Sequence, residues 1–465
     1  MTPDAFINDL IARARVAQAE YEKFDQRQVD DVVAAIAWSV MEPSRNRRLA
    51  EHAVQATGLG DADHKFSKNY RKTLGLLRDL TGAPSVGIIS EDVAQGMVEI
   101  ARPVGVVGAI TPSTNPVATP TNKVMNALKG RNAIILAPSP RGEAVCGELV
   151  TLFQSALETV GAPPALVQKL PAPVTKVTTE SLMCAVDLIV ATGSQNNIRA
   201  AYSSGTPAVG VGAGNVAVIV DETAECLDVA EKILASKTFD NATSCSSENS
   251  VVVVDSAYDA LVASLESRGA LMLDADAKMA LQQLMWPQGK LNPAVIAQSA
   301  RQIAQMAGII PESGRAFTTL LVGETGTGPD YPFSGEKLCP VLALYRVADF
   351  DAALAQVCRI YSYQGAGHSV GIHTQNPDRP IRIGLELPTC RVIVNQAHCF
   401  ATGGSFDNAL PFSLSMGCGS WGGNSISENL NYRHYLNIVR VVTPIPAQEV
   451  SPEDLLSDYW SRYGK

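Results

Sequence analysis

The chain has 465 residues, of which 46% are hydrophobic and 18% are charged, a composition typical of a globular protein with a large buried core. Its formal net charge of -9 argues against nucleic acid or an anionic membrane as the main partner. No apolar run approaches the roughly 18 residues needed to cross a bilayer. The N-terminus, with Asp4 and Asp9, lacks the pattern of a signal peptide, so we expect a cytoplasmic protein with no membrane partner.

Nine cysteines are scattered along the chain, and none forms a CxxC pair. An odd number without close pairs argues against a disulfide framework and against a zinc site. We therefore expect no metal, and most of these cysteines are expected to be small buried hydrophobic residues.

Hydrophobic periodicity predicts helices in residues 1–85, followed by alternating strands and helices. This rhythm is typical of parallel β units with crossover helices. Residues 412–431 are rich in Gly, Ser and Asn and are expected to form a loop or lid, whereas the strand-like run 438–442 can pair with another subunit. The predicted strands, in chain order, are 97–101, 104–110, 133–136, 167–170, 188–191, 216–220, 251–254, 341–344 and 370–373.

Two predicted strands end in segments that can bind a ligand. The strand 104–110 runs into the turn Thr111–Pro116, which places Asn115 at the carboxyl end, where open α/β sheets hold their ligands. The Asn115 amide can donate to a developing oxyanion or can simply cap the turn. After the strand 188–191, Gly193 and Ser194 begin a helix whose free N–H groups can face a phosphate.

Cys245 lies in the polar run 241–250, between a predicted helix at 224–239 and the strand 251–254. A cysteine inside a cell is usually inert and buried, but serine, threonine and glutamate neighbours are a poor composition for a core segment. This context favours a nucleophilic thiol. The preceding stretch 188–220 contains no Asp or Glu, so no carboxylate is available there to activate water.

The glycine-rich run 210–215 does not match G-x-G-x-x-G, and by itself it predicts only a tight turn.

Two further residues have two interpretations each. Glu336 precedes the strand 341–344 and either faces solvent or accepts hydrogen bonds from ribose hydroxyls. His368, in the glycine-rich turn before the strand 370–373, either acts as a base or bonds to the backbone as a structural histidine.

Taken together and in order, these segments resemble the coenzyme A-acylating aldehyde dehydrogenases, a branch that includes the aldehyde half of bifunctional aldehyde-alcohol dehydrogenases. The resemblance covers roughly residues 100–440. It is carried by PVGVVGAITPSTNP, ALKGRNAIILAPSPR, AAYSSGTPAVGVGAGNVAVIVD, SCSSENSVVVV, EKLCPVLALY, GAGHSVGIHT and MGCGSWGGNSISEN.

The resemblance implies an α/β aldehyde dehydrogenase fold with a Rossmann-like NAD-binding domain, a catalytic domain and a small oligomerisation element. The NAD-binding domain is expected mainly in residues 1–236, with an oligomerisation strand near 94–103. The catalytic domain is expected at 237–420, and residues 421–465 are expected to return to the NAD-binding and oligomerisation region. A homo-oligomer, dimer or tetramer, is expected.

The resemblance also implies roles for single residues. Cys245 matches the nucleophile, Asn115 matches the oxyanion-stabilising Asn, and His368 is kept as a third candidate catalytic residue. The water-activating Glu of hydrolytic relatives is replaced here by the acid-free segment GVGAGN, and their KPS-type Lys is missing from Leu136–Pro140. The residues expected to bind the cofactor are Thr111, Pro112, Ser113, Thr114, Ser139, Pro140, Gly193, Ser194, Gly212 and Glu336.

The expected reaction begins with attack of Cys245 on an aldehyde, and hydride leaves to NAD or NADP. Coenzyme A then accepts the acyl group as co-substrate. Segments such as RKTLGLLRDL are most similar to the branch that acts on sulfoacetaldehyde, whose sulfonate calls for a cationic or donor-rich pocket. Acetaldehyde, propionaldehyde and succinate semialdehyde stay open, as do a hydrolytic aldehyde dehydrogenase and a binding protein with a dead site.

Overall fold

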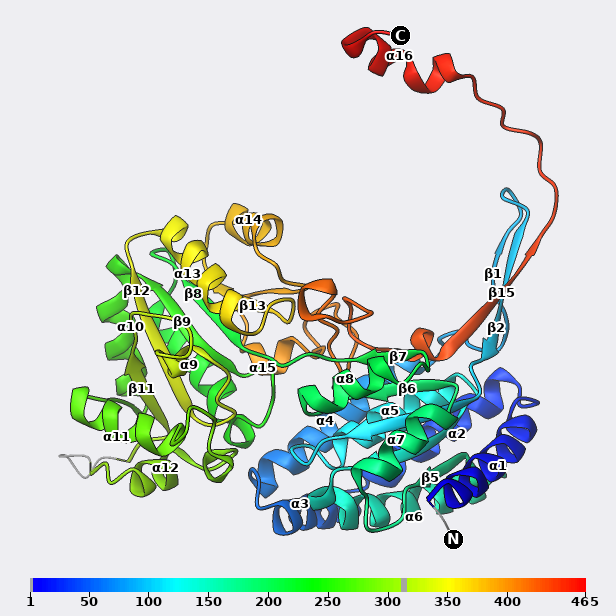
Figure 1. Cartoon of the computed structure of the whole chain (residues 1–465), viewed down its shortest axis with the longest axis horizontal. Helices are drawn as coiled ribbons and strands as arrows, with labels where there is room; N and C mark the ends of the chain where they lie inside the picture. The colour runs from blue at the N-terminus through cyan, green and yellow to red at the C-terminus, as the bar shows by residue number, and fades with distance from the viewer. Residues whose placement is uncertain (1–2, 311–315) are drawn as a thin grey trace.

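The structure is a computed structural model that describes residues 3–310 and 316–465. Two α/β lobes lie side by side, and a narrow three-stranded arm projects from one of them (Figure 1). The chain leaves the first lobe, builds the second, and returns to the first before it ends. Among the described residues, no helix is both long enough and apolar enough to span a membrane.

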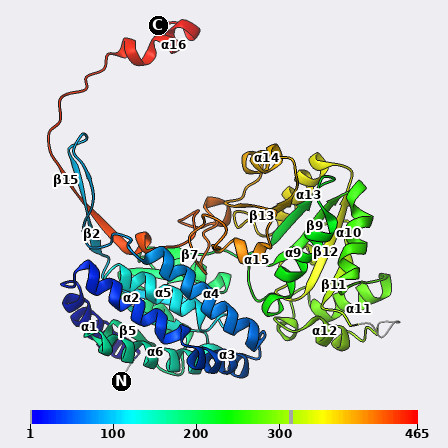
Figure 2. The same cartoon turned by 180° about the vertical axis from the view of Figure 1, so that it is seen from behind.

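The first lobe is built on a five-stranded parallel sheet with the order β5-β4-β3-β6-β7. Every residue of β3, β4 and β6 is buried, which explains their uninterrupted apolar runs. Helices cover both faces of the sheet, as the two opposite views show (Figures 1 and 2). The strands are β3 (Val106–Thr111), β4 (Ala133–Pro138), β5 (Val167–Lys169), β6 (Leu188–Ala191) and β7 (Ala208–Gly210). The helices are α1 (Pro3–Tyr21), α2 (Gln26–Met41), α3 (Pro43–Thr57), α4 (Ala62–Leu80), α5 (Ala118–Lys129), α6 (Glu143–Thr159), α7 (Lys176–Ala185) and α8 (Gln195–Ser203).

The second lobe is built on a seven-stranded parallel sheet with the order β10-β11-β12-β9-β8-β13-β14. Its central strands β8 and β9 are buried along their whole length. The strands are β8 (Val216–Val220), β9 (Glu248–Val254), β10 (Ala270–Met272), β11 (Thr319–Gly323), β12 (Val341–Val347), β13 (Val370–His373) and β14 (Val392–Val394). The helices are α9 (Cys226–Thr238), α10 (Asp255–Ser267), α11 (Ala275–Met285), α12 (Ala300–Met306), α13 (Phe350–Tyr363), α14 (Asp378–Glu386) and α15 (His398–Ala401).

The arm is an antiparallel sheet of β1 (Gly87–Asp92), β2 (Met97–Pro103) and β15 (Leu436–Val442), with β2 in the middle. Beyond β15 the chain extends away from both lobes and ends in α16 (Pro452–Tyr463), a helix that the sequence analysis did not predict (Figure 1). Apolar side chains such as Leu455 and Tyr459 are exposed on this helix.

The structure confirms the α/β fold with parallel sheets, and it locates the division between the lobes differently from the sequence analysis. Strand β8 pairs with β9 and β13, so the second lobe begins at Val216 and not after residue 236. The glycine-rich run 210–215, which joins β7 to β8, is the crossing between the lobes. The segment 412–431 contains a short 3-10 turn, Ser420–Gly422, and an isolated antiparallel bridge between Met416 and Asn429, and is otherwise irregular, in agreement with the expected loop.

Candidate active site

A cavity of about 520 Å³ lies between the two lobes, at the carboxyl ends of β3 and β6. This is the edge at which open α/β sheets bind ligands. The second lobe contributes the loop before β9 and the loop before β12, and Leu414 and Met416 of the segment 412–431 complete the wall. The cavity is therefore assembled from parts of the chain that are far apart in sequence.

Most of the predicted site residues line this cavity. Among the thirteen residues named from the sequence, Pro140 and His368 do not. The eleven that do are Thr111, Pro112, Ser113, Thr114, Asn115, Ser139, Gly193, Ser194, Gly212, Cys245 and Glu336. The nucleophile candidate, the oxyanion candidate and all the expected cofactor residues except Pro140 thus line the same cavity.

Cys245 lies in a tight turn in which the Ser247 N–H donates to the Ser244 carbonyl at 3.0 Å. The polar run around it is not a surface segment, because Ser246, Ser247 and Glu248 are all buried where β9 enters the sheet. As a residue Cys245 is partly exposed, and it lines the cavity. Burial raises the pKa of its thiol to about 12, and the nearby Glu336 carboxyl adds to this increase. In the unliganded protein the thiol is therefore protonated at neutral pH.

Gly214 is a site residue that the sequence analysis did not identify. A Cβ atom built on Gly214 would lie only 1.9 Å from the Cys245 carbonyl oxygen. The Gly214 N–H also acts to lower the pKa of the Glu336 carboxyl. Because it has no side chain, Gly214 lets the segment 210–215 between the lobes lie close to both the Cys245 loop and the Glu336 carboxyl. The absence of an acid from GVGAGN was noticed in the sequence, but the need for a glycine at this position depends on a contact that only the fold creates.

Glu336 is the only acidic residue among the described residues that line the cavity. Burial raises the pKa of its carboxyl to about 8, although the Gly214 N–H and two lysines, Lys237 and Lys337, act in the opposite direction. Its backbone N–H donates to the Gln364 side chain at 3.2 Å. Near neutral pH this carboxyl is largely protonated, so it can donate as well as accept a hydrogen bond.

His368 is buried outside the cavity. Only 1% of it is exposed, and its Nδ1 shares a hydrogen bond of 2.7 Å with the Ser369 hydroxyl. Burial lowers the pKa of its imidazole to about 3, with a further contribution from the Arg391 guanidinium. The ring is therefore neutral at physiological pH, and it is separate from the cavity wall in this structure. The role of His368 as a base stays a prediction, and the histidine does not line the cavity.

No lysine or arginine is found among the described residues that line the cavity. Hydrogen-bond donors are abundant instead, from Ser113, Thr114, Gln195, Thr243 and Ser244. Of the two kinds of pocket expected for a sulfonate, the wall matches the donor-rich kind. The described residues also contain no group of three or more His, Cys, Asp or Glu side chains that can hold a metal ion.

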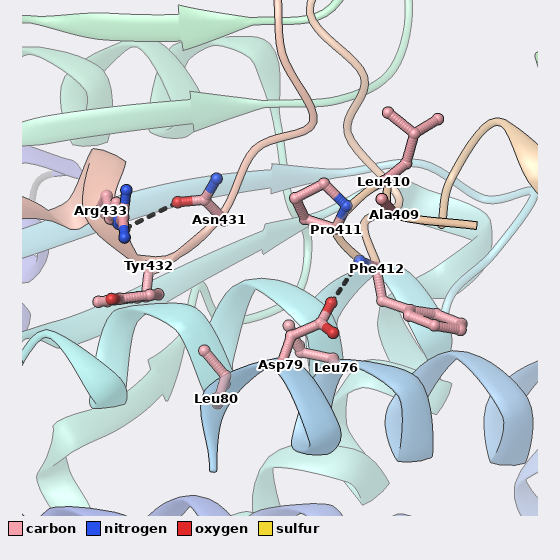
Figure 3. Close-up of a pocket in the computed structure, with 10 residues that line it drawn as sticks. All are labelled: Leu76, Asp79, Leu80, Ala409, Leu410, Pro411, Phe412, Asn431, Tyr432 and Arg433. Carbon is pink, nitrogen blue, oxygen red and sulfur yellow. Dashed lines mark hydrogen bonds between the residues drawn. The ribbon is translucent and has the colours of Figure 1, made fainter. Parts of the chain in front are cut away.

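A second cavity, of about 330 Å³, lies between the end of α4 and the segments 409–412 and 431–433 (Figure 3). Its acid, Asp79, accepts the Phe412 N–H at 2.6 Å, and its Asn431 side chain accepts the Arg433 N–H at 3.0 Å. It contains no cysteine and none of the predicted site residues. The cavity that contains Cys245 is therefore the candidate active site.

A family model described as "Aldehyde dehydrogenase family" matches residues 3–407 of the chain. The chain belongs to the aldehyde dehydrogenase family. It is 58% identical over 456 residues to a sulfoacetaldehyde dehydrogenase (acylating) from Cupriavidus necator, a match that covers 98% of this chain and 92% of that protein. It is 41% identical to a second sulfoacetaldehyde dehydrogenase (acylating), from Bilophila wadsworthia, with 99% of both chains covered.

The fold has close counterparts among solved structures. The crystal structure of an acetylating aldehyde dehydrogenase from Geobacillus thermoglucosidasius superposes with a TM-score of 0.92 at 35% sequence identity, covering 97% of this chain and 98% of that one. The fold and family expected from the sequence motifs are confirmed.

Proposed function

We propose that the chain is a coenzyme A-acylating aldehyde dehydrogenase that oxidises sulfoacetaldehyde to its coenzyme A thioester, with NAD or NADP as the electron acceptor. The observation that carries the proposal is the arrangement of Cys245 and Asn115 in one cavity whose only described acidic residue is Glu336. The 58% identity to an acylating sulfoacetaldehyde dehydrogenase supports both the reaction and the substrate.

Cys245 is proposed to attack the aldehyde carbon through its sulfur, which gives a hemithioacetal. The thiol must lose its proton on the way, because its pKa of about 12 leaves little thiolate in the unliganded site. Asn115 is proposed to donate from its amide to the oxygen that becomes negative during the attack, a contribution worth roughly 3–4 kcal/mol in comparable sites. Loss of a hydride then leaves an acyl thioester on the Cys245 sulfur.

The acyl group is proposed to be released by coenzyme A and not by water, because the described residues of the cavity wall lack an ionised carboxylate that can activate water. Glu336 is protonated in large part near neutral pH, because the pKa of its buried carboxyl is about 8. No other carboxyl group of the described residues lines the cavity to deprotonate a water molecule. A thiolate acceptor needs no such base once it is ionised, so it can displace the Cys245 sulfur directly.

The first lobe has features that fit a dinucleotide cofactor. The N-terminus of α8 opens on the cavity at Ser194 and Gln195, and such helix ends attract phosphate groups. The hydroxyl of Ser139 is buried at the cavity without a hydrogen-bond partner among the described residues. Glu336 can accept a hydrogen bond from a ribose hydroxyl. A bound nicotinamide cofactor supplies the hydride acceptor.

Sulfoacetaldehyde is favoured by the donor-rich wall, because a sulfonate offers three acceptor oxygens. Hydroxyl and amide donors can bind it without a fixed cation. The proposal also includes a homo-oligomer working in the cytoplasm. The projecting arm and the exposed apolar residues of α16, including Leu455 and Tyr459, support subunit contacts.

The test is NADH formation from a panel of aldehydes, with and without coenzyme A, together with detection of the product by mass spectrometry. We expect NADH formation beyond the first turnover to depend strictly on coenzyme A, and a kcat/KM for sulfoacetaldehyde at least roughly tenfold above that for acetaldehyde, propionaldehyde or succinate semialdehyde. Sustained formation of free acid without coenzyme A would contradict the acylating assignment. A preference for another aldehyde would contradict only the substrate. Cys245→Ala is the control that must abolish NADH formation.

A further inference from the structure

A buried charged cluster lies directly behind the active-site cavity. Its members are Lys65 and Lys68 of α4 and Asp240 of the loop between α9 and Cys245. The Asp240 Oδ2 atom accepts from Lys65 Nζ at 3.0 Å and from Lys68 Nζ at 2.5 Å, and all three side chains are almost fully buried. Two cations and one anion leave a net positive charge behind the cavity wall.

Lys65 donates to the Thr114 carbonyl at 3.0 Å, and Asp240 accepts from the Thr243 hydroxyl at 2.7 Å. Lys68 is the member that contacts Asn115. Its ammonium group donates to the Asn115 side-chain oxygen at 2.8 Å and to the Thr243 hydroxyl at 3.0 Å, in addition to Asp240. An ammonium group has three N–H donors and no acceptor. Lys68 therefore has one acceptor for each donor, and the position of its Nζ atom is fixed from three directions.

This contact dictates the orientation of the Asn115 amide. Because Lys68 can only donate, the oxygen end of the amide must face it, and the nitrogen end must face away. The Asn115 nitrogen donates to no other residue in the part of the chain that the structure describes, and Asn115 lines the cavity. The two N–H groups are thus left for a group bound in the cavity.

We propose that Lys68 is a positioning residue that holds the Asn115 amide with its N–H groups toward the substrate oxygen. The inference rests on the proposed function, in which Asn115 donates to the oxyanion. The same ammonium holds Thr243, which lies two residues before Cys245, so Lys68 links the oxyanion donor to the nucleophile loop. An uncharged residue at this position leaves the amide free to turn over and present its oxygen to a developing negative charge.

The backbone around Asp240 is shaped to support this arrangement. Asp240 has a φ of +51°, a left-handed conformation that Asp tolerates better than most residues. Its carboxylate also accepts the Asp61 N–H at 2.8 Å, at the start of α4. A Cβ atom on Gly60 would lie 2.0 Å from the Asp240 Oδ1 atom, so only glycine allows this approach. The cluster therefore joins α4 of the first lobe to the cysteine loop of the second.

The experiment compares Lys68→Met with Lys72→Met under saturating coenzyme A and cofactor. Lys72 lies one turn further along α4, is also buried, and donates to the Gly403 and Gly404 carbonyls without contacting Asn115. We expect Lys68→Met to lower kcat roughly 10- to 100-fold, the range for loss of a hydrogen bond from a charged group. The KM for the aldehyde should change much less. Lys72→Met should keep a kcat close to that of the unmodified protein.

A double-mutant cycle separates positioning from a general structural effect. In the Asn115→Ala background, Lys68→Met should cause little further loss of kcat, because the group that it positions is gone. Additive losses would overturn the proposal, as would an unchanged kcat in Lys68→Met. If Lys68→Met does not fold, Lys68→Gln takes its place in the cycle, since an amide bonds to its neighbours but can present either end to Asn115. The proposed function is tested separately: the unmodified protein should form acyl-CoA, and Asn115→Ala should lose this activity.

Discussion

Replacement of Gly214 by alanine tests how closely the lobe crossing approaches the nucleophile. The new Cβ atom would lie 1.9 Å from the Cys245 carbonyl oxygen, 2.7 Å from its carbonyl carbon and 2.9 Å from its Cβ atom. The Gly214 backbone does not have a positive φ, so the penalty is steric and not conformational. A separation of even 3.0 Å requires a shift of about 1 Å, and the nearest atoms belong to backbone that cannot rotate away.

A displacement of about 1 Å at a reacting group can lower the rate roughly 100-fold, or about 2.7 kcal/mol in the activation free energy. Overpacking of this kind also lowers the free energy of unfolding, by about 1–3 kcal/mol. We therefore expect Gly214→Ala to fold with reduced stability and to lose most of its activity. The matched control is Gly323→Ala, at the end of β11, where an added Cβ atom meets nothing within 4 Å.

The assay is single-turnover NADH formation at a temperature well below the melting point of the variant. Single turnover isolates the steps up to the acyl thioester from later transfer to coenzyme A. A Gly214→Ala protein that forms NADH at the unmodified rate would refute the steric argument. A similar loss in Gly323→Ala would show that the effect is not specific to the contact with Cys245.

Three pH-dependent predictions follow from the titratable groups in and behind the cavity. Iodoacetamide should alkylate Cys245 at a rate that rises with pH from 7 to 10 without a plateau, because the pKa of the thiol is about 12. Peptide mass spectrometry can follow the alkylation. A plateau in the rate below pH 8 would contradict this expectation. Glu336→Gln should speed that alkylation more at pH 9 than at pH 7, since the Glu336 carboxyl, with a pKa of about 8, is anionic mainly at the higher pH. Burial raises the pKa of Asp240, but Lys68 and Lys65 outweigh it and hold this pKa at about 2, against an ordinary value of 3.8. The stability from this depression, about 2 kcal/mol, is complete above pH 4 and is lost as the pH falls toward 2. Urea denaturation of Asp240→Asn should therefore show a smaller loss of stability across this window, and an unchanged pH dependence would count against the ion cluster.

The sequence predicted the elements whose apolar runs are long and buried. Strands such as β4 and β8 are apolar at every position because both faces of a parallel sheet are covered, so they could be recognised without the fold. The sequence also predicted Cys245 and Asn115, since each lies in a turn that follows or precedes such a strand. The family resemblance added the cofactor residues, most of which line the cavity.

What the sequence did not reveal depends on contacts between distant segments. The polar composition around Cys245 suggested an exposed loop, whereas Ser246, Ser247 and Glu248 are buried because polar partners, such as the Ser236 hydroxyl on Glu248, lie within the fold. Lys68 is 47 residues before Asn115 and 172 residues before Asp240, and no local pattern signals their meeting. The predicted NAD-binding range of mainly 1–236 includes β8, whose apolar run does not reveal that it pairs with β9 and β13 of the second sheet.

The acyl group that the proposed reaction places on Cys245 can be followed directly. The protein is mixed with sulfoacetaldehyde and NAD or NADP without coenzyme A, quenched with acid and digested, and the peptide that contains Cys245 is weighed by mass spectrometry. We expect this peptide to carry the sulfoacetyl group in an amount equal to the NADH formed, and to lose it on addition of coenzyme A as the acyl-CoA appears. A peptide that stays unmodified while NADH and free acid accumulate would contradict the central claim that Cys245 holds the acyl group for transfer to coenzyme A.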